Sequence, residues 1–219
     1  MRRAVLFDMD GVISDTERFY VDGLVEMLGQ EGVKVTPAEL SDMFGSTQVY
    51  IWNKLIDRYH LTGKVEEYVD AVHGIRDRLI REHGLLPMPG VLELIRKLHE
   101  AGVLLAVASS SPRETIEHNM EIFGVWDCLD TIVSGVECEK GKPEPEIYLK
   151  AAANLGVLSG ECVVIEDSTN GVKAGKAAGM YCHAYVPPQA YKQDVSTADD
   201  ILESFEGLSV EDILCNEKE

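Results

Sequence analysis

Basic residues are scarce in this sequence of 219 residues, which holds 20 lysines and arginines against 38 aspartates and glutamates. The formal net charge is therefore −18. A surface this acidic repels nucleic-acid backbones and anionic lipids, so the composition argues against a nucleic-acid or membrane partner. The same charge repels anionic substrates at long range. A site for a phosphate group must therefore be built locally, from backbone amides and a few chosen cations.

Long apolar runs and paired cysteine motifs are also missing. No apolar run reaches the length that spans a membrane, and the segment 1–8 is too short for a signal peptide. The five cysteines are odd in number, scattered and without a CxxC pair. This pattern argues against a disulfide framework or a zinc site and favours reduced thiols in a cytoplasmic protein. Hydrophobic residues make up 45% of the chain, which is enough for a packed core.

The stretch Ala4–Val12 organises the sequence, because a short apolar run in it ends abruptly in Asp8, Met9, Asp10 and Gly11. The run is too short for a helix and reads as a strand that is buried on both faces, as in a parallel sheet. Ligands of such sheets bind beyond the carboxyl ends of the strands. Two acids so close together repel each other, and Mg²⁺ is the natural cation to offset that repulsion.

Beyond Gly90, apolar segments alternate with helical patterns along the chain. Four of these segments read as further buried strands, at residues 103–108, 131–133, 162–165 and 181–186. Alternating strands and helices predict an α/β fold with a Rossmann-like parallel sheet that is covered on both sides. Ser111, followed by proline and then Glu114, has the form of a helix capping box, and Ser168 can cap a later helix.

Residues 16–86 show only helical spacing, with about four apolar patterns and no strand-like alternation. We therefore predict a four-helix-bundle cap at 16–86, inserted after the first strand into a catalytic core made of 1–15 and 87–219. The last part of that core, residues 186–219, holds nine acids and two lysines. We predict this tail as a solvated surface.

Chemically useful side chains follow four of the predicted strands. Each has an ordinary explanation alone, such as a turn, a loop serine, a solvated lysine or acids at a helix N-terminus. Together they supply two carboxylates, a hydroxyl, an ammonium and an acid pair at one edge of one sheet, as phosphoryl transfer requires. The set, in chain order, is Asp8, Asp10, Ser109, Lys142, Glu166 and Asp167.

The segment Asp8–Thr16, with Ser109, Lys142–Pro143 and Glu166–Asp167, resembles the four-motif signature of the haloacid dehalogenase-like hydrolases. It is most similar to the β-phosphoglucomutase-like phosphatases, which carry a helical cap. The resemblance implies that Asp8 attacks phosphorus to form an aspartyl-phosphate. It also implies that Asp10 protonates the leaving alkoxide and then deprotonates the incoming water.

Further roles follow from the same resemblance. Mg²⁺ would be held by Asp8, the backbone carbonyl of Asp10 and Asp167, with Glu166 either a direct ligand or a neighbour of the ligands. The phosphoryl oxygens would be held by Lys142, the Ser109 hydroxyl and backbone amides at Met9–Asp10 and Ser110. Lys140 is a rival for Lys142, but only Lys142 directly precedes the proline that the family pattern has. Candidate substrate contacts or hinge residues at and within the cap are Asp15, Thr16, Tyr20, Gln48 and Arg76.

The expected activity is hydrolysis of a small phosphorylated metabolite, a sugar phosphate above all, by a monomer or weak dimer. A β-phosphoglucomutase-type mutase is the alternative, but such mutases carry a histidine and a cap arginine where this chain has Tyr20 and Gln48. Glutamine cannot clamp a second phosphate as arginine does, unless Arg76 takes that role. A phospho-receiver module or an inactive sugar-phosphate binder is less favoured, because the helical insert and the filled catalytic positions speak against them.

Overall fold

The chain folds into two compact units in the computed structural model, which describes residues 2–43, 48–188 and 193–214. The larger unit takes in the segment up to Ser14 and most of the chain from Pro87 onward. The smaller unit comprises Asp15–Leu86. The second unit is thus inserted shortly after the first strand of the larger one.

The larger unit is built on a six-stranded, all-parallel sheet in the order β3-β2-β1-β4-β5-β6. Its chain order reverses beside β1, which has β2 on one side and β4 on the other. In open sheets of this kind, ligands bind at that reversal point. The strands are β1 (Ala4–Phe7), β2 (Leu104–Ser109), β3 (Thr131–Ser134), β4 (Cys162–Glu166), β5 (Tyr181–Tyr185) and β6 (Asp200–Leu202).

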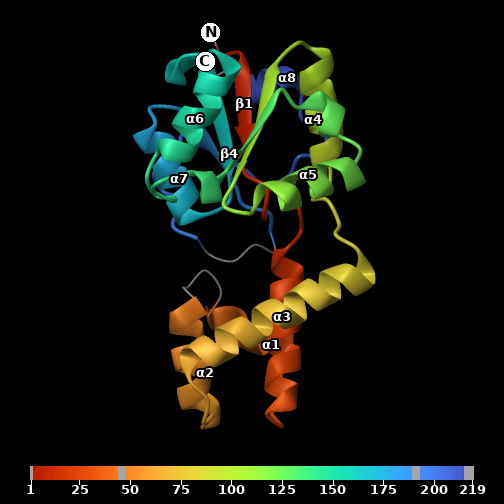
Figure 1. The fold of residues 1–219 in the computed structure, drawn as a ribbon, viewed down its shortest axis with the longest axis vertical. Helices are drawn as coiled ribbons and strands as arrows, with labels where there is room; N and C mark the ends of the chain where they lie inside the picture. Colours follow the sequence, from red (N-terminus) through yellow and green to blue (C-terminus); the bar gives the residue numbers. More distant parts are fainter. Residues whose placement is uncertain (1, 44–47, 189–192, 215–219) are drawn as a thin grey trace. The chain divides into compact units, whose positions relative to one another are not determined.

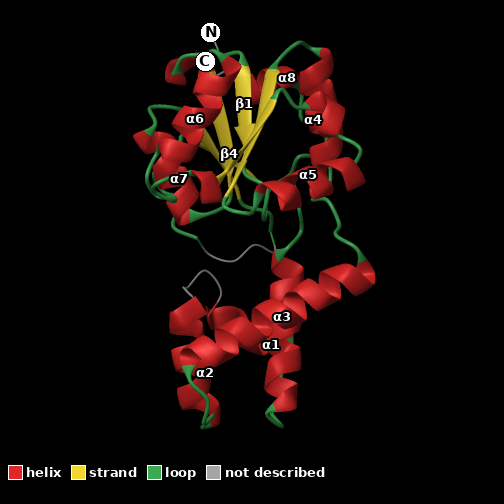
Figure 2. Ribbon diagram, viewed as in Figure 1, coloured by secondary structure: helices red, strands yellow, loops and turns green. Residues whose placement is uncertain are grey.

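Helices cover both faces of the sheet, which confirms the α/β fold class (Figures 1 and 2). One face carries α6 (Glu146–Leu155) and α7 (Thr169–Ala177), and the other carries α4 (Val91–Glu100), α5 (Arg113–Ile122) and α8 (Val210–Leu214). All four residues of β1 are fully buried, as a strand covered on both faces requires. The short 3₁₀ helices of this unit are η2 (Trp126–Cys128), η3 (Gly135–Glu137) and η4 (Ser159–Glu161).

The smaller unit has no strand among its described residues, and its helices α1 (Glu17–Gln30), α2 (Gln48–Tyr59) and α3 (Val65–His83) pack around one apolar core. In that core the rings of Trp52 and Tyr68 stack with centroids 4.6 Å apart. Between α1 and α2 lies a short 3₁₀ helix, η1 (Pro37–Met43). Within it Leu40 is buried in the core of the smaller unit.

The tail after β5 is part of the core, so the prediction of a solvated surface is wrong. It contributes β6 to the sheet and α8 to one face, and it buries Leu202, Phe205 and Ile213. The phenyl ring of Phe205 stacks on Tyr185 at 4.0 Å between centroids. The prediction failed because acids surround these few apolar anchors, so the charge of the segment masked its hydrophobic pattern.

No helix among the described residues combines the length and the hydropathy needed to cross a membrane. The four cysteines within the described part of the chain are free thiols. Burial raises the pKa of Cys162 to about 11 and that of Cys182 to about 12, so both thiols stay neutral. They fill core volume and are poor nucleophiles.

Replacing Phe205 tests the structural role of the tail. We expect Phe205→Ala to lower the free energy of unfolding by about 3–5 kcal/mol, because it opens a cavity beneath β6. Ile201→Ala is the matched control in the same segment, since Ile201 is 56% exposed and its truncation should cost less than about 1 kcal/mol. Urea denaturation measures both. Equal small losses would contradict a packed tail.

His183 makes the fold sensitive to acid. Burial lowers its pKa below the ordinary 6.5, although the Ile213 carbonyl, 3.1 Å from Nε2, and Asp200, 3.4 Å from Nδ1, act in the opposite direction. Below pH 6.5 the unfolded state therefore binds a proton that the folded state does not, and this contribution to stability is lost as the pH falls. We expect the unfolding free energy to fall less steeply between pH 6.5 and 5 in His183→Gln than in the wild type. Parallel slopes in urea titrations would contradict this.

Candidate active site

The candidate site lies at the carboxyl ends of the central strands of the larger unit. Asp8 follows β1, Ser109 ends β2, Glu166 ends β4, and Asp167 comes directly after it. The strands are in register, with Phe7 opposite both Val107 and Ile165, so these ends form one edge. The sheet topology therefore collects side chains that are more than 150 residues apart in the chain.

A buried ion triad forms the centre of the site. The Lys142 ammonium lies 2.5 Å from Asp8 Oδ1 and 2.7 Å from Glu166 Oε1, and it donates a third hydrogen bond to the Ala108 carbonyl at 3.1 Å. The side chains of Lys142, Asp8 and Glu166 are 8%, 10% and 1% exposed. All three ammonium hydrogens are thus in use. The rival Lys140 is placed differently, since its backbone N–H donates to Glu146 and its side chain is not part of the triad.

Glu166 is the most heavily hydrogen-bonded carboxylate of the site. Its Oε1 accepts from Lys142 and from the buried Tyr148 hydroxyl at 3.0 Å, and its Oε2 accepts from Asp167 N, Ser168 N and Ser168 Oγ. A Cβ at position 171 would collide with this carboxylate, so Gly171 is needed to admit it. Ser168 also caps α7 by accepting from Gly171 N, as predicted. Both oxygens of Glu166 are therefore committed to fixing Lys142 and the loop after β4.

Burial and charge set the protonation of the triad. Burial raises the pKa of Asp8 to about 7, an increase that Lys142 opposes and that Glu166 and Asp10 reinforce. Burial also disfavours the charged Lys142, but Asp8 and Glu166 outweigh it and hold the lysine pKa well above its ordinary value. Burial acts against the Glu166 carboxylate too, yet Lys142 and the Ser168 donors keep its pKa low. Asp8 is the acid that would gain most from a further positive charge.

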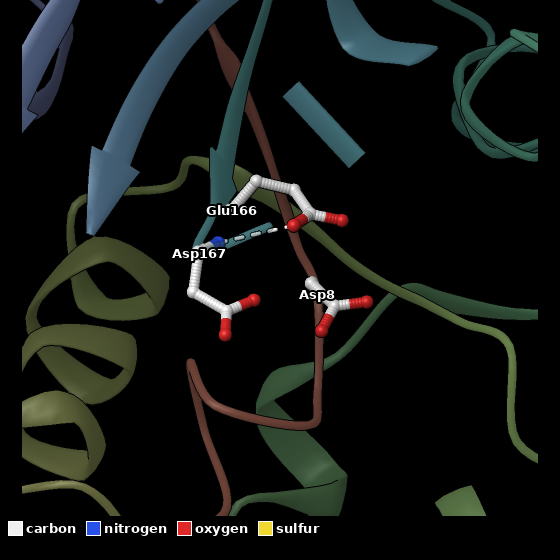
Figure 3. Close-up of side chains that lie close together, drawn as sticks. All are labelled: Asp8, Glu166 and Asp167. Atoms are coloured by element: carbon white, nitrogen blue, oxygen red, sulfur yellow. Dashed lines mark hydrogen bonds between the residues drawn. The ribbon is translucent and has the colours of Figure 1, made fainter. Parts of the chain in front are cut away.

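Three carboxylates could hold a cation, since ligand atoms of Asp8, Glu166 and Asp167 all lie within 4.8 Å of one another. Figure 3 shows them converging from the ends of β1 and β4. Carboxylate oxygens are the ligands that Mg²⁺ prefers, so the donor set fits this ion. The hydrogen bonds of Glu166 favour Asp8 and Asp167 as the direct carboxylate ligands. Gly11, at φ +84°, lies so close to the Asp167 carboxylate that a Cβ there would clash with it.

Asp10 contacts the serines after β2. Its Oδ2 accepts from Ser111 Oγ at 3.0 Å and, more weakly, from Ser109 Oγ at 3.4 Å. The predicted capping box at Ser111 is wrong, because α5 begins at Arg113 after Pro112 and has no side-chain cap. Instead of capping α5, the Ser111 hydroxyl donates a hydrogen bond to Asp10. Ser110, whose backbone amide was expected to bind phosphate, lies between these two serines.

The remaining candidates belong to the smaller unit and are described within it. Asp15 Oδ1 accepts from Arg18 N at 3.4 Å, and Thr16 precedes α1 without a side-chain cap. The guanidinium of Arg76 is paired with Asp77 at 2.8 Å. The Tyr20 hydroxyl is buried with no hydrogen-bond partner in the described chain. Gln48 opens α2, and residues 44–47 of the same predicted cap turn lie outside the described residues.

Two contributors were missed by the sequence reasoning, Tyr148 and the hydroxyl of Ser111 as a partner of Asp10. Tyr148 is separated from Glu166 by 18 residues and reads as one more apolar position of α6. No local pattern could have shown that its hydroxyl faces the site. Ser111 could have been recognised, because it is the third of three consecutive serines at the end of a strand. It was instead interpreted as a helix cap.

Acids, hydroxyls and a buried lysine, gathered at the carboxyl edge of a parallel sheet, define an enzyme that transfers phosphoryl groups. A family model described as haloacid dehalogenase-like hydrolase matches residues 5–185. The chain belongs to this family. Several of its relatives are named phosphatases, and it is a phosphoric monoester hydrolase.

Three relatives are informative. Hexitol phosphatase B of Escherichia coli (strain K12) is 32% identical over 214 residues, covering 96% of each chain. The bifunctional riboflavin kinase/FMN phosphatase of Arabidopsis thaliana is 33% identical over 94% of this chain, which spans only 54% of that longer protein. The crystal structure of a putative β-phosphoglucomutase from Thermotoga maritima has a TM-score of 0.75 at 28% identity, covering 94% of this chain and 96% of the other.

The different bonding of the two adjacent acids gives a direct test. We expect Asp167→Asn, which removes a charged ligand, to weaken Mg²⁺ binding more than Glu166→Gln, for which a loss of about 10–100-fold is typical of a residue that only supports the ligands. Calorimetric titration of each purified variant with Mg²⁺ measures this. Similar losses in both variants would show that Glu166 is itself a ligand.

Proposed function

We propose that this chain is a Mg²⁺-dependent phosphatase that hydrolyses a phosphorylated sugar or polyol through an aspartyl-phosphate intermediate. The observation that carries the proposal is the buried triad, in which Lys142 holds the carboxylate of Asp8 at the end of the central strand. A carboxylate fixed in this way is oriented to act as a nucleophile. The family match and the phosphatase relatives support the same reaction.

In the first half of the reaction, a carboxylate oxygen of Asp8 attacks the phosphorus atom of the ester. The bond between phosphorus and the ester oxygen breaks, and its electron pair leaves with that oxygen. Asp10 gives its proton to the departing alkoxide, which is a poor leaving group without it. The products are the free alcohol and a phosphorylated Asp8.

In the second half, water attacks the phosphorus of the aspartyl-phosphate and gives a proton to Asp10. The bond from phosphorus to the Asp8 oxygen then breaks, which restores the carboxylate and releases inorganic phosphate. Asp10 regains the proton that it lost, so each turnover leaves the enzyme unchanged. Lys142, the Ser109 hydroxyl and the backbone amides near Ser110 hold the phosphoryl oxygens throughout.

The electrostatics of the site support a bound Mg²⁺. Burial raises the pKa of Asp8 and so disfavours its ionised form in the metal-free chain. Asp8, Asp167 and the backbone carbonyl of Asp10 would hold Mg²⁺, whose charge favours the ionised nucleophile and offsets its repulsion from the phosphate. The net charge of −18 makes such local compensation necessary.

The proposed substrate class rests on the relatives and on the smaller unit. Hexitol phosphates and FMN both carry a phosphate monoester on a polyhydroxylated chain. Burial raises the pKa of Tyr20 to about 12, so its unpaired hydroxyl stays neutral and can bond a substrate hydroxyl. Tyr20 and Arg76 are therefore the proposed substrate contacts, with Asp15, Thr16 and Gln48 as further candidates at the same unit.

A panel of phosphorylated metabolites assayed with Mg²⁺ tests the proposal. We expect phosphate release from sorbitol 6-phosphate or related polyol and sugar monoesters, and a loss of about a thousandfold or more in Asp8→Asn, because the amide cannot act as the nucleophile. Released phosphate is the readout. Unchanged release by Asp8→Asn would overturn the role of Asp8.

The same preparation separates hydrolysis from isomerisation. Glucose 1-phosphate with a bisphosphate primer should yield inorganic phosphate and glucose if the chain is a phosphatase. Efficient conversion to glucose 6-phosphate without phosphate release would replace the phosphatase by the mutase.

A further inference from the structure

We infer that Ser111 is a positioning residue that holds Asp10 in place for proton transfer, an inference that rests on the proposed function. The Ser111 hydroxyl donates to Asp10 Oδ2 at 3.0 Å across the gap between the loops after β2 and β1. Among the described residues no hydrogen bond to Asp10 Oδ1 is present. The contact thus fixes one oxygen of Asp10 and leaves the other to exchange a proton.

Two serines touch Asp10, but they are not equivalent. Ser109 Oγ is 3.4 Å from Asp10 Oδ2, which is a long contact, and Ser109 has a second proposed task, the binding of a phosphoryl oxygen. When its single hydroxyl hydrogen turns to the substrate, that contact is lost. Ser111 is therefore the donor that still orients Asp10 once the substrate is bound.

The backbone around Ser111 is itself fixed. Its carbonyl accepts from the fully buried Ser134 hydroxyl at 2.7 Å, and its N–H donates to Ser109 Oγ at 3.0 Å. Ser134 pairs in register with Ser109 on the neighbouring strand. A Cβ on Gly135 would lie 3.0 Å from the Cα of Ser110, so the chain after β3 packs closely under this loop. The position of the hydroxyl is thus set by β3 as well as by β2.

Loss of the hydrogen bond from Ser111 to Asp10 should affect some leaving groups more than others. Proton transfer by a positioned acid contributes about 10²–10⁴-fold to rates, but only where the departing oxygen needs the proton. Glycerol leaving from glycerol 2-phosphate needs it, and p-nitrophenolate leaving from p-nitrophenyl phosphate does not. A loosened Asp10 should therefore slow the first substrate much more than the second, whereas damage to phosphate binding or to folding would slow both.

The test measures release of the leaving group in a single turnover with excess enzyme and Mg²⁺. We expect Ser111→Ala to slow glycerol release by about 10-fold or more and p-nitrophenolate release by less than about 3-fold. Ser111→Thr keeps the hydroxyl and should restore glycerol release to within about 3-fold of the wild type. Ser159→Ala, in the 3₁₀ helix η4 at the opposite end of β4, is the control and should match the wild type on both substrates.

Asp10→Asn separates failure of this inference from failure of the proposed function. If Asp10→Asn shows the split between the two substrates and Ser111→Ala does not, the role of Ser111 is overturned and that of Asp10 stands. If Asp10→Asn itself shows no split, the proposed general acid is overturned, and the inference falls with it. Equal slowing of both substrates by Ser111→Ala, with an unchanged thermal unfolding curve, would assign Ser111 to phosphate binding instead.

Discussion

The buried triad of Asp8, Lys142 and Glu166 is the constraint on which the rest of the larger unit depends. Three charged side chains are taken out of water there, and each must be compensated because an unpaired buried charge destabilises a fold by several kcal/mol. The compensation is visible on every side of Glu166, in a tyrosine hydroxyl, a serine hydroxyl and two backbone amides. The triad carries one negative charge in excess, so it is balanced locally and still attracts a cation.

The same triad limits how a phosphate group can enter. Lys142 has three hydrogens, and all of them are already donated to Asp8, Glu166 and the Ala108 carbonyl. Lys142 can bind a phosphoryl oxygen only by giving up one of these bonds, and in the proposed mechanism that bond is the one to Asp8. The four other donors on Glu166 prevent that acid from following the lysine. In the proposed mechanism, Glu166 therefore keeps its hold on the lysine while Asp8 is released to act as the nucleophile.

The sequence predicted the parts of this arrangement that depend on pattern and topology. Buried parallel strands are continuous apolar runs, and the carboxyl ends of such strands meet at one edge, so Asp8, Ser109 and Glu166 could be brought together without coordinates. What depends on side-chain direction could not be foreseen. In the sequence pattern Tyr148 and Phe205 are simply apolar positions. Their contacts, with Glu166 and Tyr185, are made to residues about 20 positions away in the chain and leave no local signal.

Four carboxylates stand at one edge of one sheet, and their chemical identity is the same. What separates their roles is the set of donors around each one. Glu166 accepts five hydrogen bonds and serves as a fixed anchor. Among the described residues only Lys142 donates to the Asp8 side chain, whose raised pKa suits an acid that exchanges one partner for another. The Ser111 hydroxyl holds Asp10, and Gly11 leaves room for the Asp167 carboxylate. A sequence motif shows which acids are present, but their different roles can be inferred only from the hydrogen-bond donors around each one.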